Sequence, residues 1–148
     1  MPRKTIYLLL FIFMAYASYS QETKAEKDSI ARNHSPVEGK AIVYFLRPTS
    51  FGALIKMNIE CDSVHIGSTY AGKYVYTILD TGLHHFISRA ENNASLDIKL
   101  EAGKLYYIKQ KVKMGFLFAE TGLELADEKD GKKYLGKCKL SKDNVFTE

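Results

Sequence analysis

Short stretches in which apolar and polar residues alternate, separated by turn residues, make up most of the chain after Gly39. Residues 96–100 read Leu-Asp-Ile-Lys-Leu, which is typical of a strand buried on one face. Residues 41–46 are instead continuously apolar and end at Arg47-Pro48, a pattern that predicts a buried strand. Similar patterns predict further strands over residues 54–60, 64–66, 73–79, 83–90, 105–114, 116–119 and 138–140.

Turns recur about every 8–12 residues, and this spacing predicts an all-β fold. We expect an antiparallel β-sandwich of about seven or eight short strands, with a barrel as the alternative. No helical pattern of about 10–15 residues separates the strands, which argues against a parallel sheet. Residues 127–135 are predicted to form at most one short C-terminal helical turn, because Gly131 interrupts them.

One turn, Asp80-Thr81-Gly82, is expected to connect two neighbouring strands. Gly82 should have a positive φ, because it follows a turn residue and at once begins a strand. The inward-facing residues Ile78 and Leu83 or Phe86 would then meet across the core.

The first 20 residues have the pattern of a removable export signal. Basic residues precede an apolar run over residues 6–17, and Ser18 and Ser20 supply the small side chains of a cleavage site before Gln21. The apolar run is about a dozen residues long, short of the ~20 that a membrane-spanning helix needs. No Cys precedes Cys61, so a lipid anchor is not expected. The sequence predicts a periplasmic or secreted protein with no membrane span after cleavage.

The part that follows the signal is nearly neutral. The net charge is +4 for the whole chain and falls to about +2 when Arg3 and Lys4 leave with the signal. This balance excludes a polybasic nucleic-acid-binding domain and an acidic disordered tail. We expect a polar tether over residues 21–38, the sandwich domain over 39–140 and a tail over 141–148.

The two cysteines, Cys61 and Cys138, form an even pair in a compartment that oxidises thiols. A disulfide between them would close a long loop and stabilise the fold by ~4 kcal/mol. Two separate buried thiols are the alternative, and the sequence leaves both open.

Four short motifs, in a fixed order, suggest a family: Gly39–Tyr44 with Arg47-Pro48, Val64–Gly67, Asp80–His85 and Ala102–Tyr107. Through these motifs, residues 38–140 resemble the exported bacterial family called domain of unknown function 2846. The resemblance implies a sandwich of the Ig/PEGA-like type and an envelope setting, but no reaction. In the family, this turn usually contains Pro-Gly followed by a His two residues later. In this chain Thr81 stands in the Pro position, whereas Gly82 and His84 match the family pattern. Transthyretin-like and carboxypeptidase-regulatory modules share the strand spacing and are a second resemblance.

The sequence contains no serine nucleophile elbow, phosphate-binding loop, paired zinc motif or EF-hand loop. His84 and His85 are neighbours on a predicted strand, so they face opposite sides and cannot bind one metal together. We therefore expect no metal and no cofactor, and a structural role for His84. A thiol-dependent site using Cys61 with His65 or His84 is the catalytic alternative.

Two surface features suggest binding. Tyr70, Tyr74 and Tyr76 could form an exposed aromatic stripe for sugars or proteins, or they could pack between strands. A row of lysines at positions 109, 111 and 113 could bind anionic envelope polymers, or it could protect an edge strand from aggregation.

The sequence thus predicts a non-enzymatic, exported envelope module that binds a protein or polysaccharide partner. The alternative is a thiol-dependent enzyme or redox protein that uses Cys61.

Overall fold

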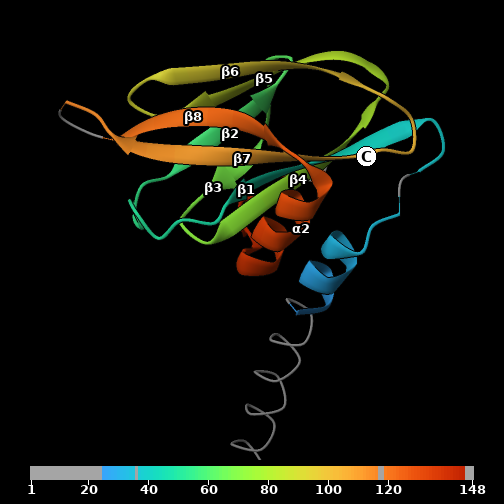
Figure 1. The fold of residues 1–148 in the computed structure, drawn as a ribbon, viewed down its shortest axis with the longest axis horizontal. Coiled ribbons are helices and arrows are strands. Elements are labelled where there is room, and N and C mark those ends of the chain that lie inside the picture. Colours follow the sequence, from blue (N-terminus) through green and yellow to red (C-terminus); the bar gives the residue numbers. More distant parts are fainter. Residues whose placement is uncertain (1–24, 36, 117–118, 146–148) are drawn as a thin grey trace, which may run out of the picture. The chain divides into compact units, whose positions relative to one another are not determined.

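The computed structural model describes residues 25–35, 37–116 and 119–145 (Figure 1). The predicted export signal over residues 1–20 lies outside them. The chain divides into two units, with the boundary between His34 and Ser35. In the described part of the first unit, residues 25–32 are helical, so the expected tether contains a helix. No helix in the described part of the chain is long and apolar enough to cross a membrane.

The second unit is mostly β and consists of two sheets and one helix. Nine strands and the helix α2 follow one another in the described residues: β1 (Lys40–Arg47), β2 (Met57–Cys61), β3 (Val64–Thr69), β4 (Lys73–Asp80), β5 (Gly82–Arg89), β6 (Asn93–Leu100), β7 (Leu105–Met114), β8 (Ala119–Ala126), α2 (Glu128–Lys137) and β9 (Lys139–Leu140). One sheet has the order β8-β7-β1-β4-β9 and the other the order β3-β2-β5-β6.

Several strand boundaries differ from the prediction: β3 continues to Thr69, past the expected residues 64–66, and β6 begins at Asn93, before the expected residues 96–100. The strand expected over residues 54–60 begins only at Met57, because residues 51–54 form a turn. Of the strand expected over residues 116–119, residues 117 and 118 lie outside the described part of the chain, and the described strand β8 covers Ala119–Ala126. Gly122 pairs with Lys111 in the middle of that strand and does not end it.

The expected antiparallel arrangement is wrong for the five-stranded sheet, where β1 pairs with β4 antiparallel but with β7 parallel. The short strand β9 also runs parallel to β4. Parallel neighbours need a long connection between them. Here β5 and β6 of the other sheet lie in that connection, so no helical crossover is required.

The turn at residues 80–82 connects the two sheets and is not a hairpin. Gly82 has φ +133°, which confirms the expected positive value. Leu83 does not reach the core, because 73% of its surface is exposed. Phe86 does, and its ring lies edge-on to Phe45 of the facing sheet, with 5.3 Å between the ring centres.

One apolar core lies between the two sheets. The five-stranded sheet contributes Ala41, Val43, Phe45, Val75 and Ile108, and the four-stranded sheet contributes Ile59, Cys61, Ile66, Phe86, Ile98 and Leu100. Alternation in β1 and β4 therefore directs one face of the large sheet inward.

The segment after β9, expected as a tail, is bound to both sheets in its described part. The Ser141 hydroxyl donates to the Ser68 carbonyl of β3 at 2.7 Å. The Asn144 side chain accepts from the Tyr76 backbone N–H of β4 at 2.7 Å. These bonds connect β3 and β4 along one side of the core.

The ten-residue helix α2 corrects the prediction of at most one helical turn. Asp127 caps its N-terminus by accepting from the Asp130 N–H at 2.8 Å. Gly131 does not interrupt the helix: it lets α2 approach the sheet, because a Cβ atom there would lie 2.2 Å from Cγ of Tyr107. Glycine is therefore required by close packing.

We predict that Gly131→Ala destabilises the protein, because the methyl group overlaps the Tyr107 ring. Overpacking of this kind costs about 1–3 kcal/mol. The matched control is Gly136→Ala in the same helix, where a Cβ atom meets nothing within 4 Å and helix propensity should contribute about 1 kcal/mol of stability. Thermal and urea unfolding measure both. Equal effects would show that α2 does not pack on Tyr107.

Candidate functional site

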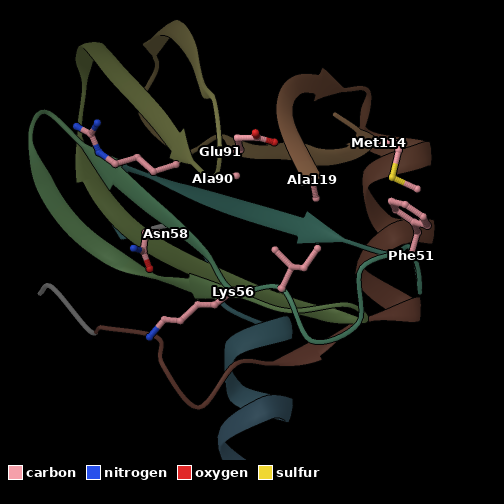
Figure 2. Close-up of a pocket in the computed structure, with 9 residues that line it drawn as sticks. Phe51, Lys56, Asn58, Ala90, Glu91, Met114 and Ala119 are labelled. Carbon is pink, nitrogen blue, oxygen red and sulfur yellow. The ribbon is translucent and has the colours of Figure 1, made fainter. Parts of the chain in front are cut away.

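An open groove of about 580 Å³ lies where β2 and β8 begin and β5 and β7 end (Figure 2). It is lined by Phe51, Ile55, Lys56, Asn58, Arg89, Ala90, Glu91, Met114 and Ala119. Several segments distant in sequence therefore meet in one concave surface.

The groove has an apolar part and a polar part. Figure 2 shows Phe51 and Met114 close together, with Lys56 and Asn58 towards the other side. Phe51 is 43% exposed and Met114 is 76% exposed. Exposed apolar side chains beside charged ones are the usual composition of a surface that binds another molecule.

The buried side chain of Arg47 fixes the loop that carries Phe51. Its guanidinium donates to the backbone carbonyls of Ile55 at 2.6 Å, Gly52 at 2.7 Å and Phe51 at 3.3 Å. Burial lowers the pKa of Arg47, and no carboxylate of the described residues lies within ion-pair distance of it. The loop carbonyls therefore accept from both terminal nitrogens of the guanidinium, whereas its buried Nε has no hydrogen-bond partner among the described residues, and the loop wall of the groove depends on these bonds.

A buried polar network joins the two sheets beside the groove. Thr69 of β3 donates to Gln110 of β7, and Gln110 donates to Ser88 of β5 at 2.5 Å. The Ser88 hydroxyl is 2.7 Å from that of Thr121 on β8. The Asn92 side chain binds the Thr121 backbone twice: its Oδ1 accepts from the Thr121 N–H at 2.6 Å, and its Nδ2 donates to the Thr121 carbonyl at 3.0 Å. These bonds fix the positions of β5 and β8, which contribute Arg89 and Ala119 to the groove.

A second cluster lies at the β2–β3 turn. The Nδ1 of His84 is 2.6 Å from the Asp62 carboxylate and 3.7 Å from Sγ of Cys61, and Sγ is 3.5 Å from the same carboxylate oxygen. The Nε2 of His84 is 3.0 Å from the Asp80 carbonyl. This bond fits the structural role expected for His84.

The pKa values of the Cys61 thiol and the Asp62 carboxyl are shifted in opposite directions. Burial, with the adjacent charge of Asp62, raises the pKa of the Cys61 thiol to about 12. The backbone N–H of His85, which donates to Asp62 at 2.9 Å, lowers the pKa of that carboxylate. Near neutral pH the cluster therefore contains a protonated thiol beside a carboxylate.

The sequence candidates involving cysteine have different outcomes. Cys61 and Cys138 are both buried and form no disulfide with each other in this structure, which is the arrangement of the separate-thiol alternative. Cys61 contributes to the core between the sheets, whereas Cys138 ends α2. Of the two histidines considered, His84 meets Cys61, whereas His65 is exposed opposite Glu60.

The tyrosine stripe is packed and not exposed. Tyr74 is fully buried and Tyr76 is 6% exposed. Their ring centres lie 6.1 and 5.8 Å from that of Tyr44 on β1. Tyr70 donates to Asp143 at 3.1 Å. The structure thus favours the packing alternative for Tyr74 and Tyr76.

The lysine row lies on β7, which is an interior strand and not an edge. Lys111 pairs with Glu124 of β8 at 2.7 Å. Lys109 lies over the Tyr134 ring of α2, 4.6 Å from its centre. These lysines connect neighbouring elements, and interactions of this exposed kind add little stability each.

Comparison with known proteins gives a family but no activity. The family described as protein of unknown function (DUF2846) matches residues 37–123. An uncharacterized protein of Haemophilus influenzae is 27% identical over 140 residues, which cover 94% of this chain and 83% of the relative. No solved structure matches the chain.

We predict that native Cys61 resists alkylation, because its thiol is buried and its pKa is raised to about 12. In a chelator-treated Cys138→Ala variant at pH 8, iodoacetamide should label Cys61 about a hundredfold more slowly than in urea. Rapid labelling of the folded protein would instead favour the thiol-dependent alternative.

The raised pKa of Cys61 also makes the stability of the fold depend on pH. A thiol whose pKa rises on folding stabilises the fold below its unfolded pKa of about 8.5, and this contribution is lost as the pH rises towards 12.

Proposed function

This chain belongs to the DUF2846 family of proteins of unknown function, and from that premise we propose that it is a non-enzymatic, exported envelope module that binds a partner protein in the groove. We propose further that its two sheets form an Ig/PEGA-like sandwich. The single core that the two sheets share supports this fold type.

The groove is the observation that carries the proposal. Phe51 and Met114 expose apolar surface beside Lys56 and Glu91. The Arg47 bonds hold the Phe51 loop in place before any partner arrives. A surface organised in advance loses less conformational entropy on binding, which favours affinity.

The chemistry of the groove favours a protein over a polysaccharide. Sugars bind well to flat aromatic faces, yet Tyr74 and Tyr76 are buried away from solvent. Phe51 is the one aromatic residue among those that line the groove. An apolar area with both charge signs beside it, from Lys56 and Glu91, suits a peptide surface.

The thiol-dependent alternative has weaker support. Cys61 and His84 are close enough to interact, at 3.7 Å. A nucleophilic thiol, however, acts as a thiolate, and the pKa of Cys61 is raised to about 12. The adjacent Asp62 carboxylate adds to that effect, so the local charge opposes the activated form.

We expect the chain in cells to lose its first 20 residues. N-terminal sequencing of the protein from the periplasmic or secreted fraction should begin at Gln21, after the small residues Ser18 and Ser20. A protein that retains Met1 and remains in the cytoplasm would refute export.

A photo-crosslinking phenylalanine analogue tests the groove directly. Placed at Met114, it should form an adduct with a discrete protein in living cells. Placed at Leu83, it should form none, although the two sites are 76% and 73% exposed. The groove lies where β5 ends, whereas Leu83 lies where that strand begins. An adduct with polysaccharide would overturn the choice of partner, and equal results at both sites would overturn the choice of surface.

Once such a partner is purified, its affinity for variants of this protein can be measured. Phe51→Ser should weaken binding by about tenfold or more, as loss of an aromatic anchor does. Leu125→Ser removes an apolar side chain of similar exposure, 48% against 43%, that does not line the groove. Binding should remain unchanged in that variant.

A further inference from the structure

We propose that Cys61, Asp62 and His84 form a binding site for a divalent transition metal of the Zn²⁺ class, with three protein ligands and one open position. The ligand atoms are Sγ of Cys61, Oδ2 of Asp62 and Nδ1 of His84, which all lie within 4.8 Å of one another. The site is independent of the groove, which shares none of these residues.

Two of the three distances between these atoms are close to those of a tetrahedral coordination shell, and the third is shorter. With ordinary zinc bond lengths, sulfur should lie ~3.5 Å from each of the other ligands, and nitrogen ~3.4 Å from oxygen. The observed distances from Sγ are 3.5 Å to Oδ2 and 3.7 Å to Nδ1. The Nδ1–Oδ2 distance is 2.6 Å, the length of a hydrogen bond between the two groups. A metal bound to both atoms requires them to separate by ~0.8 Å.

The outer contacts already orient two of the ligands. His84 directs Nε2 to the Asp80 carbonyl at 3.0 Å, so that Nδ1 faces the other two ligand atoms. Oδ1 of Asp62 accepts from the His85 backbone N–H at 2.9 Å, which turns Oδ2 inward. Metal-binding histidines characteristically donate their second N–H to a carbonyl or carboxylate in this way.

The different exposure of the ligands leaves one side of the proposed metal position open to solvent. Cys61 is 3% exposed and lies in the core, whereas the side chain of Asp62 is 48% exposed. An ion can therefore enter from the solvent side, and water can complete the tetrahedron. A structural site would instead be closed by a fourth protein ligand.

Binding consists of proton displacement and needs no oxidant or reductant. The thiol proton of Cys61 passes to solvent, as does any proton carried by Nδ1 of His84, and each atom donates its electron pair to the metal. Asp62 binds as the carboxylate that it already is. The ion thus connects the β2–β3 turn to β5, and its oxidation state does not change.

The test uses untagged full chain purified from cells, treated with chelator and titrated with Zn²⁺ or Co²⁺. We expect one ion per chain. Co²⁺ should give the near-ultraviolet absorption of a cobalt–thiolate bond, and X-ray absorption of the Zn²⁺ form should show one sulfur neighbour with nitrogen or oxygen. Cys61→Ser should abolish the thiolate absorption and weaken Zn²⁺ binding at least about tenfold.

Two matched variants separate this site from adventitious binding. His85→Asn removes a neighbouring histidine that pairs with Asp97 but meets no thiol, and Cys138→Ala removes the other buried thiol. Both should bind as the unmodified protein does. Absence of stoichiometric binding, a metal shell without sulfur, or loss of absorption in Cys138→Ala would overturn the proposal. If Cys61→Ser does not fold, the X-ray absorption result on the unmodified chain decides.

Discussion

The hydrogen bonds of the buried Arg47 guanidinium are the interaction on which the groove end of the β-structure depends. Arg47 ends the most buried strand, and removing such a charge from water costs several kcal/mol. The cost is offset by carbonyls of a loop that has no regular structure, those of Phe51, Gly52 and Ile55. Loop and charge are mutually necessary: the loop cannot move away without leaving a buried charge unsatisfied, and the charge cannot stay buried without the loop.

The two ends of the β-structure consequently have different chemistry. At the groove, hydrogen bonds of Gln110 and Arg47 hold the segments that carry the apolar side chains. At the β2–β3 turn, a tight connection places Asp62 in a left-handed conformation, with φ +49°. That conformation directs its carboxylate towards His84 and Cys61. The rigid sheets between them allow each end to be organised without help from the other.

Local alternation was enough to predict most strands, because side-chain direction in a strand depends only on neighbouring residues. It also placed Tyr74 and Tyr76 correctly on one face. It could not show that this face is buried, since that depends on the covering of the sheet by other elements. The pairing of strands within a sheet could not be predicted for the same reason: the contact of Cys61 with His84 arises from the register of β2 with β5. Gly131 was misjudged because helix propensity is local, whereas its need for a small residue comes from Tyr107.

The central position of β1 has a consequence for how the chain reaches this structure. Its antiparallel neighbour β4 follows soon after it, but its parallel neighbour β7 does not, and Ile42 pairs with Leu105. Contacts so distant in sequence carry a large loop-closure cost and slow folding. One edge of the most apolar strand therefore has no partner until β7 is in place, so a chain in which β7 has not yet paired exposes an apolar strand edge that can associate with another chain.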